Sequence, residues 1–112
     1  MTISTEQINS VVVASVQGKA LDASNARDFK SAAAPLLLPK VKLVFDLESV
    51  DFVDSTGLGA LVSCLREAHK AEGEIKLCGL TKHVRALFEL VRMHRVFDIY
   101  NTPVEAVRSY AL

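Results

Sequence analysis

Residues 41–61 read VKLVFDLESVDFVDSTGLGAL, and this stretch decides the fold. Its first seven residues, VKLVFDL, are β-branched and nearly all apolar, which is typical of a short strand covered on both faces. A helix is predicted to begin near Asp54 or Ser55, because apolar residues recur at helical spacing in the sequence that follows. These residues are Leu58, Leu61, Val62, Leu65 and Ala68. A buried strand that leads directly into an amphipathic helix indicates an α/β fold.

The residues before this stretch predict two further strands and a helix. Residues 2–9 are mostly polar and predict a short edge strand, and the valine-rich residues 11–18 predict a second strand that ends in a glycine turn. A helix follows, with Asp22 or Ser24 as the expected N-terminal cap. Its apolar residues at near-helical spacing are Ala23, Ala26, Phe29, Ala33 and Leu36.

The residues after this stretch predict two more strands, each followed by a helix. Residues 75–78 predict a buried strand, and residues 96–100 predict a shorter one. The helix that begins near Thr81 has the buried stripe Val84, Leu87, Phe88 and Val91. Thr102 stands before a proline, which is typical of the cap and first residue of a helix. On that last helix we expect Val104, Val107 and either Tyr110 or Ala111 to face inward.

The order of these elements predicts the architecture. Strands alternate with helices from the second strand onward, which indicates a mixed, mostly parallel sheet of four to five strands with about four helices packed against it. The chain has 112 residues, and no linker, low-complexity tract or repeat divides it. We therefore expect a single α/β domain over residues 1–112.

Composition limits the partners and the setting of the chain. Lys plus Arg and Asp plus Glu number 13 each, so the formal net charge is zero and no general field attracts nucleic acid or an anionic membrane. Residues 1–7 lack the pattern of a signal peptide, and no apolar run approaches the length of a transmembrane helix. The two cysteines have no CxxC spacing. We expect a cytoplasmic protein with no bound cofactor.

Residues 51–59, DFVDSTGLG, carry the chemistry of the chain. They lie just beyond the carboxyl end of the buried strand, where binding sites tend to form in open α/β sheets. Ser55 falls at or beside the helix N-cap, where its hydroxyl is expected to accept a bond from a backbone N–H group. Gly57 and Gly59 each cost a helix interior about 1 kcal/mol relative to alanine. Two such glycines in one turn indicate close approach, either of the helix to the sheet or of another chain to this loop.

A phosphate on Ser55 is compatible with this position. The N–H groups and the dipole at a helix N-terminus favour an anion, whereas Asp51 and Asp54, and Asp46 if it lies near, oppose one. Phosphorylation is therefore expected to leave the fold intact and to change the surface sharply. The competing interpretation is that Ser55 is only a cap and that the glycines serve packing alone.

The sequence DFVDSTGLGAL, placed after a strand that reads VFDL, resembles the signature of the STAS domain in bacterial anti-sigma factor antagonists. In that family the serine after the aspartate in DS[ST]G is the phosphoacceptor, which corresponds to Ser55 here. Residues 18–22, GKALD, resemble the G-x-L-D turn of the family with one extra residue, and residues 75–80 and 84–90 resemble a later strand and helix. The resemblance covers almost the whole chain.

The resemblance implies a non-enzymatic partner switch. In that family the unphosphorylated protein binds an anti-sigma factor, which is also a serine kinase with a histidine-kinase-like ATPase fold, and binding frees the sigma factor. The kinase then phosphorylates the serine and the complex separates, until a PP2C-type phosphatase restores the binding form. The residues that the resemblance implies for partner binding are Asp22, Asp54, Ser55, Thr56, Gly57, Leu58 and Gly59.

Two other functions remain open from the sequence. The chain is alternatively a constitutive scaffold or adaptor, such as the STAS subunit of a lipid-transport complex, in which the Ser55 hydroxyl only caps a helix. A small hydrolase that uses Ser55 is the weaker alternative, because the chain has no G-x-S-x-G elbow. The three histidines have no spacing typical of a metal site.

Side chains near this segment add two expectations. Four basic residues lie on or after one predicted helix: Lys82, Arg85, Arg92 and Arg95. They form either a solvated face, a basic rim of the partner surface or a distant clamp for phosphate. Phe52, Val53 and Leu58 flank Ser55. Most of these apolar residues are expected to pack inside, and any exposed one is a natural anchor for a partner.

Overall fold

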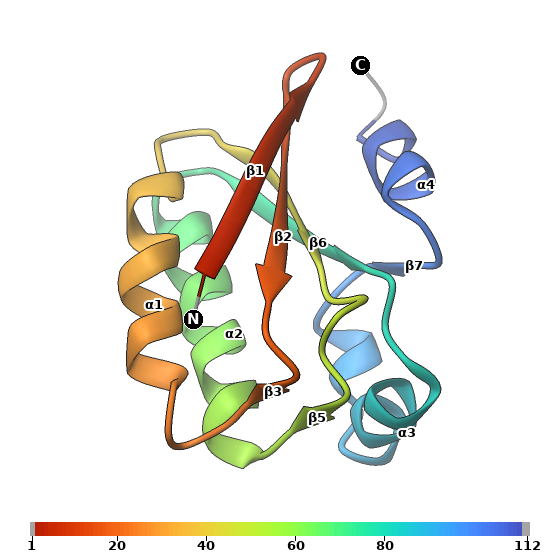
Figure 1. Cartoon of the computed structure of the whole chain (residues 1–112). Coiled ribbons are helices and arrows are strands. Elements are labelled where there is room, and N and C mark those ends of the chain that lie inside the picture. The colour runs from red at the N-terminus through yellow and green to blue at the C-terminus, as the bar shows by residue number, and fades with distance from the viewer. Residues whose placement is uncertain (1, 111–112) are drawn as a thin grey trace.

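The computed structural model of the chain describes residues 2–110 and contains one five-stranded sheet in the order β1-β2-β4-β6-β7 (Figure 1). The strands are β1 (Thr2–Ile8), β2 (Val11–Gln17), β4 (Lys42–Asp46), β6 (Glu74–Cys78) and β7 (Ile99–Tyr100). β1 pairs antiparallel with β2, and the remaining neighbours pair in parallel. The predicted mixed, mostly parallel sheet with a polar edge strand is therefore confirmed.

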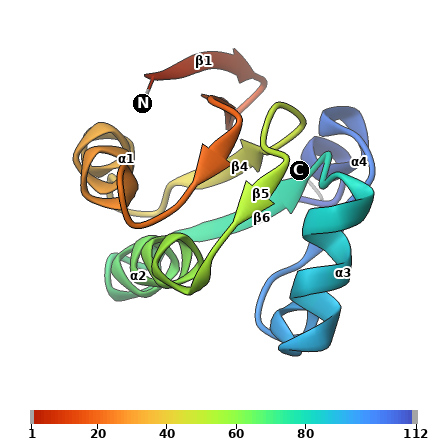
Figure 2. The ribbon, with the colours of Figure 1, turned by 60° about the horizontal axis from the view of Figure 1, so that its bottom comes forward.

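Four α-helices pack around this sheet, as predicted. They are α1 (Ala26–Ala33), α2 (Ser55–Lys70), α3 (Lys82–Leu90) and α4 (Pro103–Arg108), and short 3-10 helices follow α1 (Ala34–Leu36) and α3 (Met93–Arg95). The helices α1 and α2 lie side by side, and α4 lies apart from them across the sheet (Figures 1 and 2). No helix within residues 2–110 is long and apolar enough to cross a membrane.

The central strand β4 is buried on both faces, as its apolar sequence predicts. Leu43 and Phe45 belong to the cluster under α1 and α2, whereas Val44 belongs to the cluster under α4. All three side chains have no exposed surface. The ring of Phe29 in α1 lies 5.4 Å from that of Phe45, centroid to centroid, in a tilted aromatic pair. Burial of such large side chains fixes α1 and α2 on one face of the sheet.

The opposite face of the sheet holds a buried cation. Lys76 in β6 is only 6% exposed and lies on the α4 side of the sheet. Its Nζ donates to the carbonyl oxygen of Ser109 at 3.1 Å and to the Ser109 hydroxyl at 2.8 Å. The same Nζ lies 4.3 Å from the centroid of the Tyr110 ring, which is the geometry of a cation–π contact. These contacts attach the end of α4 to the sheet.

A second, two-stranded sheet was not expected from the sequence. The short strands β3 (Ala20–Leu21) and β5 (Phe52–Val53) pair in parallel, with Leu21 opposite Val53. Two residues are too few to show the alternation by which a strand is recognised. This pairing places the loop before α1 directly beside the segment that leads into α2.

The N-terminal cap expected for α1 is wrong. Asn25, and neither Asp22 nor Ser24, occupies the N-cap position of α1. The carboxylate of Asp22 instead accepts bonds from the Ser24 N–H at 2.9 Å and the Ser24 hydroxyl at 2.5 Å, in a turn that precedes the helix. Ala23, expected in the apolar stripe of α1, lies in this turn and is exposed.

The caps expected for α3 and α4 are confirmed, but two residues of their apolar stripes are exposed. Thr81 and Thr102 each accept a bond from the backbone N–H three residues ahead. Val91 is 41% exposed because α3 ends at Leu90, and Val104 is 54% exposed on the outer side of α4. Ala111, one of the alternative inward residues, lies outside the described residues.

Candidate functional site

Ser55 is the first residue of α2, beside an aspartate that caps the helix in its place. Asp54 is at the N-cap, and its Oδ1 accepts a bond from the Gly57 N–H at 2.8 Å. The expectation that the Ser55 hydroxyl bonds a backbone N–H group of the first turn is therefore wrong, because the adjacent carboxylate takes that role. The Ser55 residue is exposed, and within residues 2–110 its hydroxyl has no hydrogen-bond partner.

The carboxylate of Asp54 also connects two loops that are distant in sequence. Its Oδ2 accepts a bond from the Ala23 N–H at 3.1 Å, so one side chain joins the start of α2 to the turn before α1. The backbone N–H groups of Ser55 and Thr56 have no acceptor within the described part of the chain. Two donors at the positive end of a helix dipole are thus available to an anion at Ser55.

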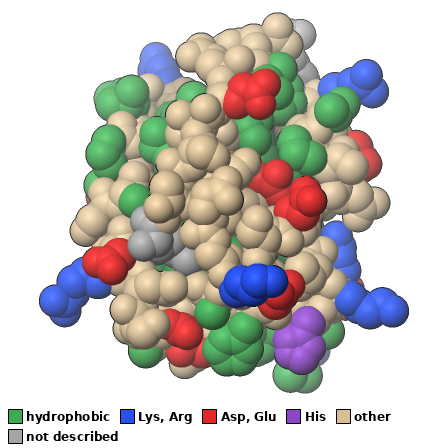
Figure 3. Space-filling view, viewed as in Figure 1, with side chains coloured by type: hydrophobic (Ala, Val, Ile, Leu, Met, Phe, Trp, Pro, Cys, Tyr) green, Lys and Arg blue, Asp and Glu red, His purple; other side chains and the backbone are tan. Residues whose placement is uncertain are grey.

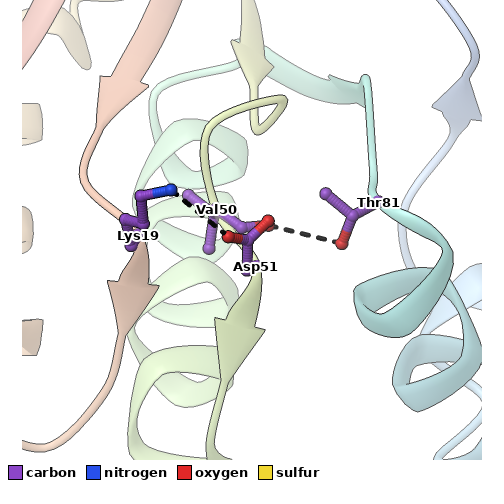
Figure 4. A network of polar contacts seen from close by, with 4 residues as sticks. All are labelled: Lys19, Val50, Asp51 and Thr81. Carbon is purple, nitrogen blue, oxygen red and sulfur yellow. Dashed lines mark hydrogen bonds and ion pairs between the residues drawn. The ribbon is translucent and has the colours of Figure 1, made fainter.

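The segment that leads into β5 is held from two sides (Figure 4). The N–H of Asp51 donates to the carbonyl oxygen of Lys19 at 2.7 Å, and the Asp51 carboxylate lies 3.9 Å from the Lys19 ammonium. On the other side, the Thr81 hydroxyl donates to the carbonyl oxygen of Val50 at 3.4 Å. The exposed ion pair adds little stability, so the backbone bonds and the burial of Val50 fix the approach to Ser55.

The two glycines of the motif have different surroundings. A Cβ atom on Gly57 would lie 2.0 Å from the carbonyl oxygen of Leu21, so only glycine allows α2 to approach β3 this closely. The predicted close approach is therefore confirmed for Gly57. A Cβ atom on Gly59 would have no atom within 4 Å, so the described chain makes no such approach there.

The remaining predicted residues divide into an outward and an inward group. Thr56 is exposed beside Ser55, and Leu58 is half-buried and packs against the main core. Asp22 lies in the turn that Asp54 holds, where the hydrogen bond from the Ser24 hydroxyl lowers the pKa of its carboxyl group. The structure brings Asp22, Asp54, Ser55 and Thr56 to one end of the molecule, and their role in partner binding stays a prediction.

Phe52 is the exposed apolar side chain of this end. It is 48% exposed, whereas its neighbour Val53 is 4% exposed and belongs to the core. Phe52 lies three residues before Ser55 in the chain, and its role as an anchor for a partner stays a prediction.

The basic side chains on and after α3 are mostly exposed. Arg85 is half-buried and donates to the Asn101 side chain at 3.2 Å, and Lys82, Arg92 and Arg95 are exposed. Acidic and basic side chains are interspersed over the face seen in Figure 3, with no wide area of one sign. A role for these residues at a partner surface stays a prediction.

Neither a metal site nor a reactive thiol is found within residues 2–110. No group of three histidine, cysteine or acidic side chains in this range is placed to hold a metal ion. Cys64 and Cys78 are buried and free, and burial raises their pKa values to about 11 and about 12. Both thiols are therefore protonated near neutral pH and behave as small apolar groups.

The sheet order, the Ser55 turn and the capping aspartate together define a known class of domain. Residues 2–106 match the STAS domain family, and the chain belongs to that family. BtrV of Bordetella bronchiseptica, which is named as an anti-sigma factor antagonist, is 26% identical over 111 residues, 98% of this chain and 95% of BtrV.

Solved structures agree with this assignment. The crystal structure of an anti-sigma factor antagonist from Mycobacterium paratuberculosis has a TM-score of 0.84 and 26% identity, over 96% of this chain and 92% of that chain. The anti-sigma factor antagonist SpoIIAA in its unphosphorylated form shares the fold, with a TM-score of 0.75 and 20% identity over 99% of this chain and 98% of its own. SpoIIAA of Bacillus has also been solved in its phosphorylated form, with a TM-score of 0.68 and 19% identity over 97% of this chain and 99% of its own. These names describe regulators and not enzymes, in agreement with the predicted non-enzymatic domain.

Proposed function

We propose that this chain is an anti-sigma factor antagonist that acts by partner switching. Its unphosphorylated form binds an anti-sigma factor that is also a serine kinase with a histidine-kinase-like ATPase fold, and the sigma factor is released. Phosphorylation of Ser55 ends this binding, and a PP2C-type phosphatase reverses it. The observation that carries the proposal is the exposed Ser55 hydroxyl, which is not needed to cap α2 because Asp54 does so.

The surface around Ser55 suits the docking of a protein in the unphosphorylated state. Ser55 and Thr56 present small neutral side chains, and Phe52 offers an apolar side chain that is 48% exposed. Aromatic side chains, including phenylalanine, are enriched at protein interfaces. A partner therefore approaches the start of α2 closely without burying an unpaired charge.

Phosphate transfer changes this surface and leaves the fold in place. Oγ of Ser55 bonds to the γ-phosphorus of ATP as the bond from that phosphorus to the bridging β–γ oxygen breaks, so ADP leaves, and a base of the kinase takes the hydroxyl proton. The N–H groups of Ser55 and Thr56 are free to donate hydrogen bonds to the phosphate oxygens, and the helix dipole stabilises the added charge of about −1.5 to −2. Asp51 and Asp54 lie close in the chain and make the phosphorylated surface strongly negative. A loss of about 3 kcal/mol in binding free energy weakens affinity on the order of a hundredfold.

The test combines the purified chain with the kinase-type anti-sigma factor of the same organism and MgATP. Intact mass should rise by one phosphate, fragmentation should place it on Ser55, and Ser55→Ala should stay unmodified. Ser49→Ala, at an exposed serine outside the predicted binding residues, is the matched control and should be phosphorylated like the parent. Phosphate on another residue, or none at all with an anti-sigma factor that binds the parent chain, overturns the proposal.

A phosphate mimic separates the switch from the alternatives. Ser55→Asp should unfold at the same denaturant midpoint as the parent and bind the anti-sigma factor about a hundredfold more weakly. Parental affinity in this variant would contradict the electrostatic mechanism. Stable membership of a larger complex without any phosphate supports a scaffold, and turnover that disappears in Ser55→Ala supports a hydrolase.

A further inference from the structure

A surface groove of about 320 Å³ lies between the N-terminal halves of α1 and α2. Alanine and glycine form much of its lining, including Ala23, Ala26 and Gly59. Thr56 also lines the groove, so the groove begins one residue from Ser55. In Figures 1 and 2 the two helices run beside each other along this side of the molecule.

Gly59 has no reason within the described chain to be glycine. It lies inside the 16-residue helix α2, where glycine costs about 1 kcal/mol relative to alanine. Its backbone is not among the positive-φ glycines, and a Cβ atom would have no atom within 4 Å. Gly57, by contrast, would place a Cβ atom 2.0 Å from a backbone oxygen. The missing side chain at Gly59 leaves the backbone of α2 open to a group from outside.

The groove also has a charge of one sign. Its charged lining residues are Arg27 and Lys30, which are both exposed and whose side chains form no ion pair or hydrogen bond with residues 2–110. Two other surface grooves carry both signs: one combines Arg85 with Glu89 and Asp98, and the other combines lysines with Glu72 and Glu74. In a chain with zero net charge, two unpaired cations on one open groove favour a ligand that carries carboxylates.

We propose that this groove receives an acidic segment of the anti-sigma factor. Its carboxylates pair with Arg27 and Lys30, and its backbone or a small side chain packs on Gly59. The inference rests on the proposed function and names which part of the partner lies beside Ser55. A phosphate on Ser55 then places negative charge at the mouth of the groove and repels the segment, so the acidic character of the partner strengthens the switch.

Charge reversal tests the electrostatic half of this inference. Arg27→Glu combined with Lys30→Glu should weaken binding of the parent's anti-sigma factor at least tenfold in 0.1 M salt, and the difference should shrink at higher salt. The matched control is Lys40→Glu combined with Arg108→Glu, which changes net charge equally on exposed residues before β4 and on α4. The control should stay within twofold of the parent.

Replacing Gly59 tests the steric half. Gly59→Ala should raise the melting temperature, because alanine favours the helix and meets no atom, yet should weaken binding at least threefold. Lys substitutions in the acidic segment of the anti-sigma factor should restore binding to the chain with Arg27→Glu and Lys30→Glu.

The outcomes distinguish this inference from the proposed function. If the parent chain neither binds the anti-sigma factor nor is phosphorylated on Ser55, the proposed function fails. If the parent binds and is phosphorylated, but the reversed-charge and Gly59→Ala variants both bind within twofold of it, the groove proposal alone is overturned. An equal loss in the Lys40→Glu, Arg108→Glu control would show general charge attraction and would also overturn it.

Discussion

The start of α2 and the contact of α4 with the sheet use polar side chains in opposite ways. At α4, the Lys76 ammonium is buried and satisfied by Ser109 and the Tyr110 ring. At α2, the Ser55 hydroxyl is exposed and has no hydrogen-bond partner within residues 2–110, although Asp54 beside it is fully engaged. A polar group that forms its hydrogen bonds within the chain stabilises the fold. A polar group without such partners is available to another molecule.

The largest effect should come from Gly57, whose absent side chain sets the position of Ser55. Gly57→Ala places a Cβ atom against the Leu21 carbonyl oxygen, which is backbone and cannot rotate away. We expect a loss of about 3 kcal/mol in the free energy of unfolding, measured by urea denaturation. Phosphorylation of Ser55 should slow as well, because α2 must move. A variant as stable as the parent would show that the start of α2 is pliable, which would weaken the contrast with α4.

Lys76 should affect stability without affecting the switch. Lys76→Ala removes the buried stem and its hydrogen bonds, and should cost about 2 to 3 kcal/mol in urea denaturation. Lys76→Met is the control and should stay within about 1 kcal/mol of the parent, since it fills the volume without burying a charge. The folded fraction of both variants should be phosphorylated on Ser55 at the parental rate. A changed rate would mean that the two regions are coupled.

Tyr110 offers a smaller test of the same contact. Its hydroxyl lies 2.6 Å from the carbonyl oxygen of Leu43 and 3.1 Å from that of Glu74, and its one proton serves mainly the shorter bond. Tyr110→Phe keeps the ring over Lys76 and removes this bond, so the free energy of unfolding should fall by about 1 kcal/mol. No change in thermal unfolding would indicate that the ring alone holds α4.

The smallest effect is the loss of stability near pH 9, which involves one buried thiol on each face of the sheet. Cys64 lies on the buried side of α2, and Cys78 belongs to the cluster under α4. Burial raises their pKa values from an ordinary value of 9 to about 11 and about 12. Above pH 9 the unfolded chain releases thiol protons that the folded chain keeps, so stability falls as pH rises from 9 towards 11. At pH 9 the loss for each thiol is well under about 1 kcal/mol. The urea midpoint measured at several pH values should show the decline, and Cys78→Ala should flatten it.

The sequence predicted the elements that carry strong periodic patterns and missed those that depend on tertiary contacts. The run at residues 42–46 and the apolar stripe of α2 identified the buried strand and the helix beside the site. The pairing of β3 with β5 was invisible, because each strand has two residues. Val104 was expected inside, but α4 is a short helix with only one covered side.

The site itself was only partly predictable. The position of Ser55 beyond a buried strand was correct, but Asp54 and Ser55 are both good capping residues, and their order alone does not say which one caps. The burial of Lys76 gave no signal in the sequence, since a lysine between apolar strand residues normally points to solvent. The open space beside Gly59 is visible only in the folded structure. The sequence alone does not distinguish a glycine that packing requires from one that packing does not require.

The Asp54 carboxylate accepts one bond from the first turn of α2 and one from Ala23, which is 31 residues away in the chain. A single side chain thus connects the two segments. The turn before α1 and the first turn of α2 are therefore tied together by that side chain. A negative charge introduced next to it acts on the two segments simultaneously. In the proposed switch, a phosphate on Ser55 would therefore influence a stretch of backbone that Ser55 does not itself contact.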